Sequence, residues 1–226
     1  MTGSKDANLD ALSAAEREAL FTSIENVRHA VAQQLSAHRG SAFPIAFIEN
    51  LQRGVDSVVQ AAIDRGVKIE CKAGCSYCCS AKVEATAPEV FRIARAVLRL
   101  PTEEVAEWVQ TLRQHVQITD GQSEWHNRKP CPFLVNHLCS VYEIRPSTCR
   151  KAHSLNVRNC ESSAKDIPQS LDIVVAAEAL MRGTADAYHQ SGLDATRHEL
   201  VNAVLRAITD PDMESRWLNG EPCSST

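Results

Sequence analysis

Four cysteines lie within nine residues in the stretch CKAGCSYCC. Three residues separate Cys71 from Cys75, two separate Cys75 from Cys78, and Cys79 follows directly. One short loop or helical turn can present thiols at this spacing to a single metal ion or cluster. The alternatives are a disulfide scaffold, a redox pair, or cysteines that pack as small apolar side chains.

The other cysteines are grouped rather than spread along the chain. Cys131, Cys139 and Cys149 lie in the stretch CPFLVNHLCSVYEIRPSTCR, and Cys160 follows soon after. Apolar packing is typical of a lone cysteine on a helix, and it does not explain eight cysteines flanked by Gly, Pro, Lys and Arg. Cys223 stands apart in the polar stretch LNGEPCSST, so we expect it to be a bystander in a solvated tail.

Composition bounds the class of protein. The 226 residues are 44% apolar and 23% charged, with a formal net charge of -4, which is typical of a globular chain with one sizeable core or two small ones. The basic residues are scattered among acidic ones, so we expect no nucleic-acid partner. No apolar run approaches the roughly 18 residues of a membrane span, and the polar start MTGSKDANLD lacks an export signal. We therefore expect a cytoplasmic protein without a membrane partner.

That expected location disfavours a disulfide framework. The count of nine cysteines is odd, and a bond between Cys78 and Cys79 would close a small strained ring. A thioredoxin-like pair at Cys75 and Cys78 would need a surrounding βαβ pattern, which the sequence lacks. The same spacing occurs in radical enzymes that use S-adenosylmethionine, but those are built on repeated strands that this chain does not predict. Metal ligation is favoured.

The elements that must position these thiols are helices. Ser13 with Glu16, and Thr86 with Glu89, have the spacing of a capping box, which indicates two helix starts. Pro101 is expected to end the second of these helices. Six amphipathic stripes predict an all-α fold with about six helices. The stripes comprise Leu20, Ile24, Val27, Val31 and Leu35; Ile48, Leu51, Val55, Val58 and Ala62; Val90, Ala94 and Val97; Val105, Trp108, Leu112 and Val116; Ile173, Ala177, Leu180, Thr184 and Tyr188; and Leu200, Val201, Val204, Leu205 and Ile208.

Two long loops, roughly 66–85 and 120–165, carry the clustered cysteines between these helices. They are too long for simple connections, and a bound metal would order them because its binding free energy becomes folding free energy. We expect the two loops to meet in space, although a helical pair between Ala87 and Pro130 separates them. Asp166 is expected to cap the next helix. The predicted single domain, 1–226, comprises N-terminal helices at 1–65, a cysteine-cluster core with a helical excursion at 66–165, and C-terminal helices and a tail at 166–226.

The ordered stretches CKAGCSYCC, CPFL and CSVYEIRPSTCR resemble the CxxCxxCC cysteine-cluster family, also called YkgJ-like, which is described as zinc- or iron-chelating. The resemblance covers about residues 68 to 155, and the first gap is three residues where the family name shows two. Cys160 lies outside the core pattern. A similar cluster in flagellin lysine methylases implies an alternative, a cluster-dependent enzyme of redox or methyl transfer. The metal ligands that the resemblance implies are Cys71, Cys75, Cys78, Cys79, Cys131, Cys139 and Cys149.

Several other residues of these stretches have expected roles. Arg145 and Arg150 flank the last motif turn, and we expect them to hydrogen-bond to carbonyls or anionic groups around the site rather than to act in catalysis. Phe133, Leu134 and Tyr142 are expected to be packing residues that keep water from the cluster. No Gly-rich nucleotide loop or acid and base pair accompanies the cysteines, so we assign no catalytic residue and favour metal binding over an enzyme.

The choice of metal rests on the donor type. Soft all-thiolate ligation suits zinc and iron–sulfur clusters alike. His137 and His153 could ligate zinc, but with so many thiols nearby we expect both to be surface or hydrogen-bonding histidines. Because no histidine is woven into the motif and a Cys-Pro pair recurs in ferredoxin-type ligation, we prefer iron in an iron–sulfur cluster over zinc.

Overall fold

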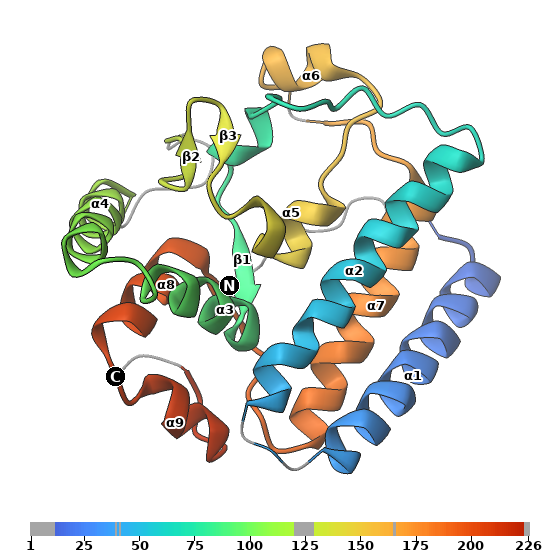
Figure 1. Cartoon of the computed structure of the whole chain (residues 1–226). Helices are drawn as coiled ribbons and strands as arrows, with labels where there is room; N and C mark the ends of the chain where they lie inside the picture. The colour runs from blue at the N-terminus through green and yellow to red at the C-terminus, as the bar shows by residue number, and fades with distance from the viewer. Residues whose placement is uncertain (1–11, 39, 41, 120–128, 165, 224–226) are drawn as a thin grey trace.

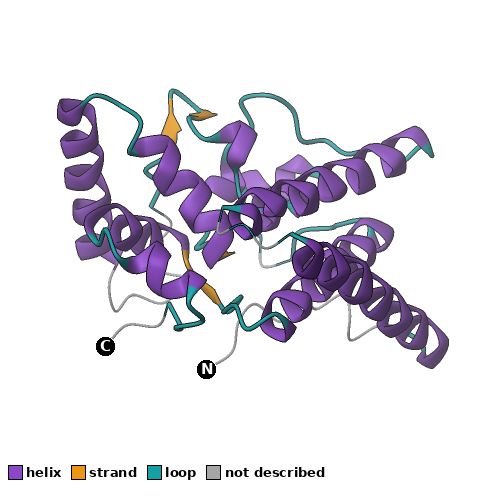
Figure 2. Ribbon diagram, turned by 60° about the horizontal axis from the view of Figure 1, so that its bottom comes forward, coloured by secondary structure: helices purple, strands orange, loops and turns teal. Residues whose placement is uncertain are grey.

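The computed structural model describes residues 12–38, 40, 42–119, 129–164 and 166–223. This part of the chain is mostly helical, as Figure 2 shows, which agrees with the predicted all-α class. Residues 120–128 and 165 of the second predicted loop lie outside the described residues, as does the polar start of the chain. In chain order the helices are α1 (Ala14–Ala37), α2 (Phe43–Asp64), α3 (Ala87–Val97), α4 (Thr102–Thr119), α5 (Ser147–Lys151), α6 (Val157–Glu161), α7 (Leu171–Gln190), α8 (Leu200–Thr209) and α9 (Met213–Leu218), with short 3-10 turns η1 (Tyr77–Ser80) and η2 (Tyr142–Ile144).

Helices α1, α2 and α7 lie side by side as a three-helix bundle (Figure 1). Their apolar stripes face one another, and Ile45, Ile48 and Val55 are almost fully buried. Gly183 lets α1 approach α7 closely, because a Cβ at that position would stand 2.6 Å from the Ile24 carbonyl oxygen and 2.7 Å from the Val27 Cβ. The bundle therefore depends on the absence of a side chain at one point of α7.

A second group of helices packs beside the bundle. Helix α3 contacts α2 on one side and α8 on the other, and α4 packs on α8. Phe91 of α3 belongs to the core shared with the bundle, whereas Ile93 belongs to a second core with Leu112, Phe133 and Val204. One helix thus joins the two cores.

Short antiparallel strand pairs fix two further junctions. Strand β1 (Glu84–Thr86) pairs with β4 (Arg197–Glu199), so that the starts of α3 and α8 are held together. Strands β2 (Leu134–Val135) and β3 (Leu138–Cys139) form a hairpin. The two residues between them, Asn136 and His137, have φ of 50° and 63°, a left-handed conformation that suits a tight hairpin turn.

The sequence located most helix starts correctly. Ser13 and Glu16 form the expected capping box, with the Ser13 N–H donating to Glu16 Oε2 at 2.8 Å. All six predicted helices are present, as α1 to α4, α7 and α8. The prediction for Asp166 was wrong, because the long helix begins at Leu171 and Ser170 is its N-cap residue. In the described part of the chain, no helix is long and apolar enough to cross a membrane.

Cys223 differs from its expected place in a solvated tail. It is buried and packs in the same core as Trp217. Its backbone N–H donates to Asp194 Oδ2 at 3.0 Å, and its carbonyl accepts from Arg206 at 3.0 Å. Its polar neighbours in the sequence gave no sign of this burial, because the contacts that bury Cys223 come from distant parts of the chain.

Candidate metal centre

The cysteines lie on segments that come together at one side of the molecule. Cys79 is on η1, Cys139 ends β3 and Cys149 is on α5. The two cysteine-bearing stretches meet, as the sequence predicted, because the Cys131 N–H donates to the Cys79 carbonyl at 2.7 Å. The helical pair α3 and α4 leaves and returns between them (Figure 1).

The first stretch is shaped by local turns. The Cys75 N–H donates to the Lys72 carbonyl at 2.9 Å, and Gly74 has φ of 84°, a conformation that glycine adopts without strain. The Cys79 N–H then donates to the Ser76 carbonyl at 3.0 Å, which begins the turn of η1. These local hydrogen bonds shape the first cysteine-bearing stretch without an apolar core.

The second stretch is anchored by a hairpin. Leu134 pairs with Cys139 across the ladder, and the Leu134 N–H also donates to the Cys131 carbonyl at 2.9 Å. Phe133 is 1% exposed and packs against Trp108 of α4, with ring centroids 5.3 Å apart. This buried ring holds the hairpin, and with it Cys131 and Cys139, against the helical layer.

Cys149 is positioned by the start of α3. The Ser147 N–H donates to Glu89 Oε1 at 2.7 Å, while Glu89 Oε2 accepts from the Thr86 N–H at 3.0 Å in the predicted capping box. Thr148 Oγ1 adds a bond to the Glu84 carbonyl at 3.0 Å. One buried carboxylate therefore caps α3 and also holds the turn of helix that carries the thiol.

The two arginines beside the motif hold its backbone, as expected. Arg150 donates through Nε to the Arg145 carbonyl at 2.9 Å and through Nη2 to the Glu143 carbonyl at 2.5 Å, and it pairs with Asp56 of α2. The Arg145 guanidinium lies 3.8 Å from the centre of the Tyr142 ring. Tyr142 is 55% exposed, so the expectation that it shields the site from water was wrong.

Five thiols form an inner group. The Cys78 S–H donates to the Cys79 sulfur; this bond, with burial, raises the pKa of Cys78 well above its usual range and lowers the pKa of Cys79. Burial raises the pKa of Cys131 to about 11, and the nearby Cys139 adds to this rise. The pKa of Cys149 also rises strongly through burial, and Cys131, Cys78 and Cys139 contribute further. These mutual influences indicate that the five thiols lie near one another.

Cys71 lies in a second neighbourhood. Its pKa is raised by burial and further by Cys75, Cys78 and Cys160, while the backbone N–H of Ser154 opposes the rise. Cys160 is on α6, which packs against η1. Sequence reasoning left Cys160 outside the core pattern, although its position 11 residues after Cys149 was the available signal.

The two histidines of this region have hydrogen-bond partners. His153 is buried; its Nδ1 lies 2.8 Å from the Lys151 carbonyl oxygen, and its Nε2 accepts the Ser170 N–H at 2.8 Å. His137, in the hairpin turn, has Nδ1 3.3 Å from Ser76 Oγ. Both ring nitrogens of His153 are therefore engaged in hydrogen bonds, in agreement with its expected role as a hydrogen-bonding histidine.

The thiols lie near one another but are not arranged around a common point. All nine cysteines are free, and within the described residues no three His, Cys, Asp or Glu side chains are already arranged to hold a metal ion. Grouped thiols are nevertheless the donor chemistry that zinc and iron–sulfur clusters use. The donor type of these residues fits such a group.

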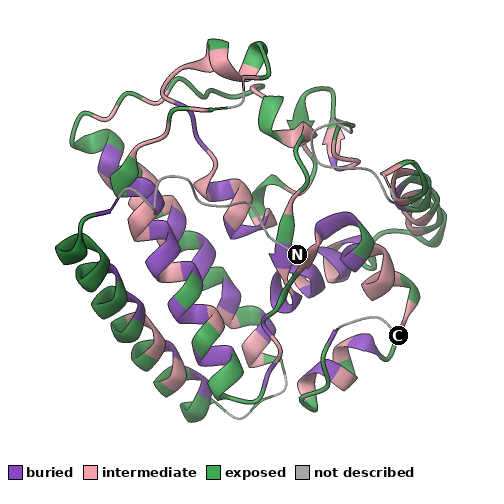
Figure 3. Cartoon of the chain, turned by 180° about the vertical axis from the view of Figure 1, so that it is seen from behind, coloured by how far each residue is buried: buried purple, intermediate pink, exposed green. Residues whose placement is uncertain are grey.

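The cysteine-bearing segments are less buried than the bundle. Figure 3 shows the inner faces of the bundle helices as buried, whereas the cysteine-bearing side is mostly half-buried or exposed.

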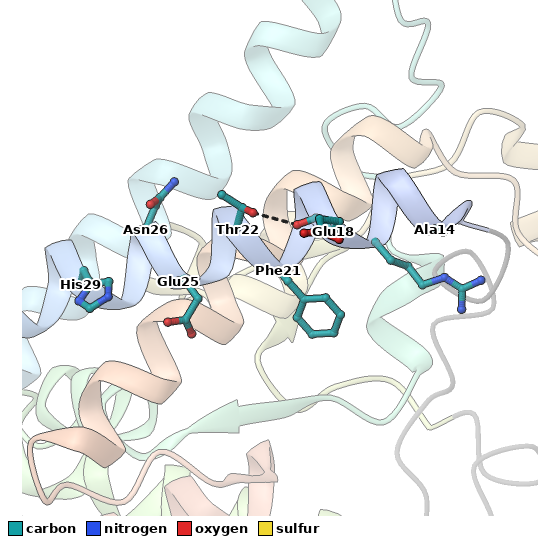
Figure 4. A pocket seen from close by; sticks show the side chains of 8 residues that line it. Ala14, Glu18, Phe21, Thr22, Glu25, Asn26 and His29 are labelled. Carbon is teal, nitrogen blue, oxygen red and sulfur yellow. Dashed lines mark hydrogen bonds between the residues drawn. The ribbon is translucent and has the colours of Figure 1, made fainter.

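A hollow elsewhere on the surface lies on the outer side of α1 (Figure 4) and includes no cysteine. Its lining residues are Ala14, Arg17, Glu18, Phe21, Thr22, Glu25, Asn26 and His29.

Comparison with known proteins identifies the cysteine-bearing region. Residues 70–168 match the family model CxxCxxCC, which is described as "Putative zinc- or iron-chelating domain". No curated protein and no solved structure matches the chain. The matched residues include both cysteine-bearing stretches and Cys160. Residues 70–168 of this chain are thus similar to the domain that this family model describes.

Proposed function

We propose that this protein chelates iron, in the form of an iron–sulfur cluster, or zinc through its clustered thiols. The observation that carries the proposal is the hydrogen bond from the Cys131 N–H to the Cys79 carbonyl, which joins two stretches that lie about fifty residues apart in the sequence. The ligands proposed from the family resemblance are Cys71, Cys75, Cys78, Cys79, Cys131, Cys139 and Cys149.

The charge balance of the inner group supports a metal. Ionised thiols packed this closely repel one another, and each buried charge is unfavourable by several kcal/mol, on the order of the usual desolvation penalty. Arg145 opposes the raised pKa of both Cys78 and Cys139, but burial and the neighbouring thiols outweigh it. A metal cation supplies the missing positive charge and lets the thiolates form.

Iron in an iron–sulfur cluster is the metal we favour. The donors are thiols, and the histidine nearest the last motif cysteine, His153, uses both ring nitrogens in hydrogen bonds. Cys131 is followed by Pro132, a pair that recurs in ferredoxin-type ligation. We place the chain in the reducing cytoplasm, where thiols stay available for metal.

Anaerobic purification tests the proposal directly. The expected product is brown, contains iron and acid-labile sulfide in near-equal amounts, and bleaches when a reductant is added. Cys149→Ser should lose the colour and the metal, whereas Cys223→Ser, the same substitution far from the cluster, should keep both.

Two other results would change the conclusion in different ways. A colourless protein with one or two zinc ions per chain would overturn the choice of iron and keep the site. A protein that takes up neither metal after reconstitution under reducing, anaerobic conditions, yet is fully folded, would overturn chelation itself.

A further inference from the structure

Helices α3 and α5 both pack against α2 and meet it at a polar junction. Figure 1 shows the two short helices on the same side of α2. Gln52 of α2 accepts a hydrogen bond from Arg92 of α3, with 2.5 Å between Oε1 and Nη1. Asp56, one turn further along α2, pairs with Arg150 of α5. Adjacent turns of α2 are thus tied to two different helices.

Two buried side chains of this junction have an unpaired polar atom. Ser147 of α5 donates its N–H to Glu89 of α3, but its Oγ has no partner among the described residues. Gln52 is 1% exposed, and its Nε2 is likewise unpaired. Exchanging the amide oxygen and nitrogen of Gln52 would set two donors, Nε2 and Arg92 Nη1, against each other, so the unpaired atom is a donor. The junction therefore lacks a hydrogen-bond acceptor.

The same junction has more cations than anions. Its ion pairs are Arg53 and Arg92 with Glu49, at 3.6 and 3.4 Å, and Arg145 and Arg150 with Asp56. Four guanidinium groups and two carboxylates leave a formal excess of two positive charges. The carboxylate of Glu89 accepts backbone N–H groups at the start of α3, where the helix dipole also offsets its charge.

We propose that the junction of α2, α3 and α5 binds a phosphate group, either free or carried by a small molecule. A phosphate monoester has a charge of about −1.5 to −2 at pH 7, which matches the excess positive charge. Its oxygens accept from several donors at once, and guanidinium groups bind them in a bidentate way. A carboxylate ligand brings one charge and two oxygens, and so it matches the junction less well.

The arginines differ in how easily an anion reaches them. Arg53 is exposed, Arg92 and Arg145 are partly buried, and Arg150 is buried. We expect the anion to contact the more exposed guanidinium groups first. Because Gln52 is buried and bonded to Arg92, its Nε2 becomes available to the anion through a movement of the Arg92 side chain.

Isothermal titration calorimetry of the full chain with inorganic phosphate tests the site. The metal content of all samples is matched, because phosphate also binds metal ions. The wild type should bind one phosphate per chain. Gln52→Glu should lower the affinity by about tenfold or more, because its carboxylate supplies the missing negative charge and repels the anion. Arg53→Gln should also weaken binding, since it removes the most exposed guanidinium of the junction.

Glycerol 3-phosphate distinguishes the two sources of the phosphate group. Tighter binding of this ester than of inorganic phosphate would assign the site to phosphorylated small molecules. Weaker binding of the ester would assign it to the free anion. Both results support the site itself.

Arg28→Gln is the matched control, because Arg28 is a partly buried arginine of α1 that pairs with Glu25, and α1 packs on α7. It should bind phosphate as tightly as the wild type. Equal weakening in this variant, which means an adventitious ion only, would overturn the site, and so would a folded wild type that binds no phosphate.

Unchanged binding by Gln52→Glu, with circular dichroism showing a folded protein, would also overturn the site. If that variant does not fold, unchanged binding by Arg53→Gln leads to the same conclusion. The inference does not rest on the proposed chelating function. Loss of the phosphate site would leave chelation standing, and a chain that binds no metal would leave the phosphate site standing.

Discussion

The three-helix bundle and the cysteine-bearing segments are held together by different interactions. In the bundle, α7 packs against α1 and α2 through buried apolar side chains, and Gly183 allows the closest approach. In the segments at 68–84 and 129–164, backbone and side-chain hydrogen bonds do most of the joining, and large side chains such as Tyr77 and Tyr142 remain exposed.

This difference indicates where a metal matters. Burial of apolar surface stabilises the bundle whether or not a metal is present. A typical hydrogen bond contributes only about 1 kcal/mol net, so we expect a bound metal to add to the order of the cysteine-bearing segments. We expect substitutions in the bundle to change global stability and metal removal to change local order.

The largest effect is expected at the closest helix contact. Gly183→Ala places a Cβ against the Ile24 carbonyl, a backbone atom that cannot move without shifting α1. We expect a loss of about 3 kcal/mol, the upper range for overpacking, measured by urea unfolding.

Gly54→Ala is the control for this substitution. Its Cβ meets only the end of the flexible Leu180 side chain, at 3.3 Å, and alanine favours the helix. It should leave stability unchanged or raise it slightly. Equal losses at the two glycines would contradict the importance of the α1 and α7 contact.

The next effect concerns a buried carboxylate that links the two regions. Glu178 of α7 is 1% exposed and pairs with Lys151 of α5 at 2.5 Å and with Arg182 at 3.0 Å. Glu178→Gln should destabilise the protein by about 2 kcal/mol at neutral pH, because it removes the buried negative charge that faces Lys151 and Arg182.

The pH dependence of that loss follows from the pKa of Glu178. Burial opposes its ionisation, but Lys151, Arg197 and Arg182 outweigh burial and hold the pKa below its ordinary value of 4.5. The stabilisation is therefore full above pH 4.5 and is lost as the pH falls through the lowered pKa. Unfolding measured from pH 7 to pH 3 should show wild type and variant converging; a constant gap would contradict the ion pair.

Metal removal should act on one region only. In hydrogen exchange followed by mass spectrometry, a chelator should speed the exchange of the Cys131, Leu134 and Ser140 amides, which hold the hairpin and its junction with η1. Amides in α1, α2 and α7 should exchange at unchanged rates. Uniform acceleration across the chain would show that the bundle also depends on the metal.

The smallest effect is expected at Cys223. Burial and Asp194 raise its pKa to about 11, so it stays a neutral thiol in an apolar site. Cys223→Ser should lower stability by about 1 kcal/mol, since the hydroxyl is harder to bury, and should leave metal content unchanged. Thermal unfolding and metal analysis of the same sample test both parts. An unchanged melting temperature would restore the tail interpretation.

Local signals in the sequence predicted the helices, because capping boxes and apolar stripes depend on residues three or four apart. That the two cysteine-bearing stretches lie close together in space could also be predicted, since a shared metal site requires it. The burial of Cys223 was not, because it depends on Arg206 and Asp194. The place of Cys160 depends in the same way on Glu70, about ninety residues earlier in the chain. Helices as short as α5 and α6 have too few residues for a periodic pattern.

The bundle draws its helices from both ends of the chain. Arg28 of α1 donates to Gln190 of α7 at 2.8 Å across 162 residues, and the region at 70–168 that matches the CxxCxxCC family model lies between them. Closing so long a loop is entropically unfavourable and slow, and the penalty falls when the intervening chain is already compact. Metal bound early to the thiols should therefore shorten the effective loop and speed assembly of the bundle, although no bundle helix carries a cysteine.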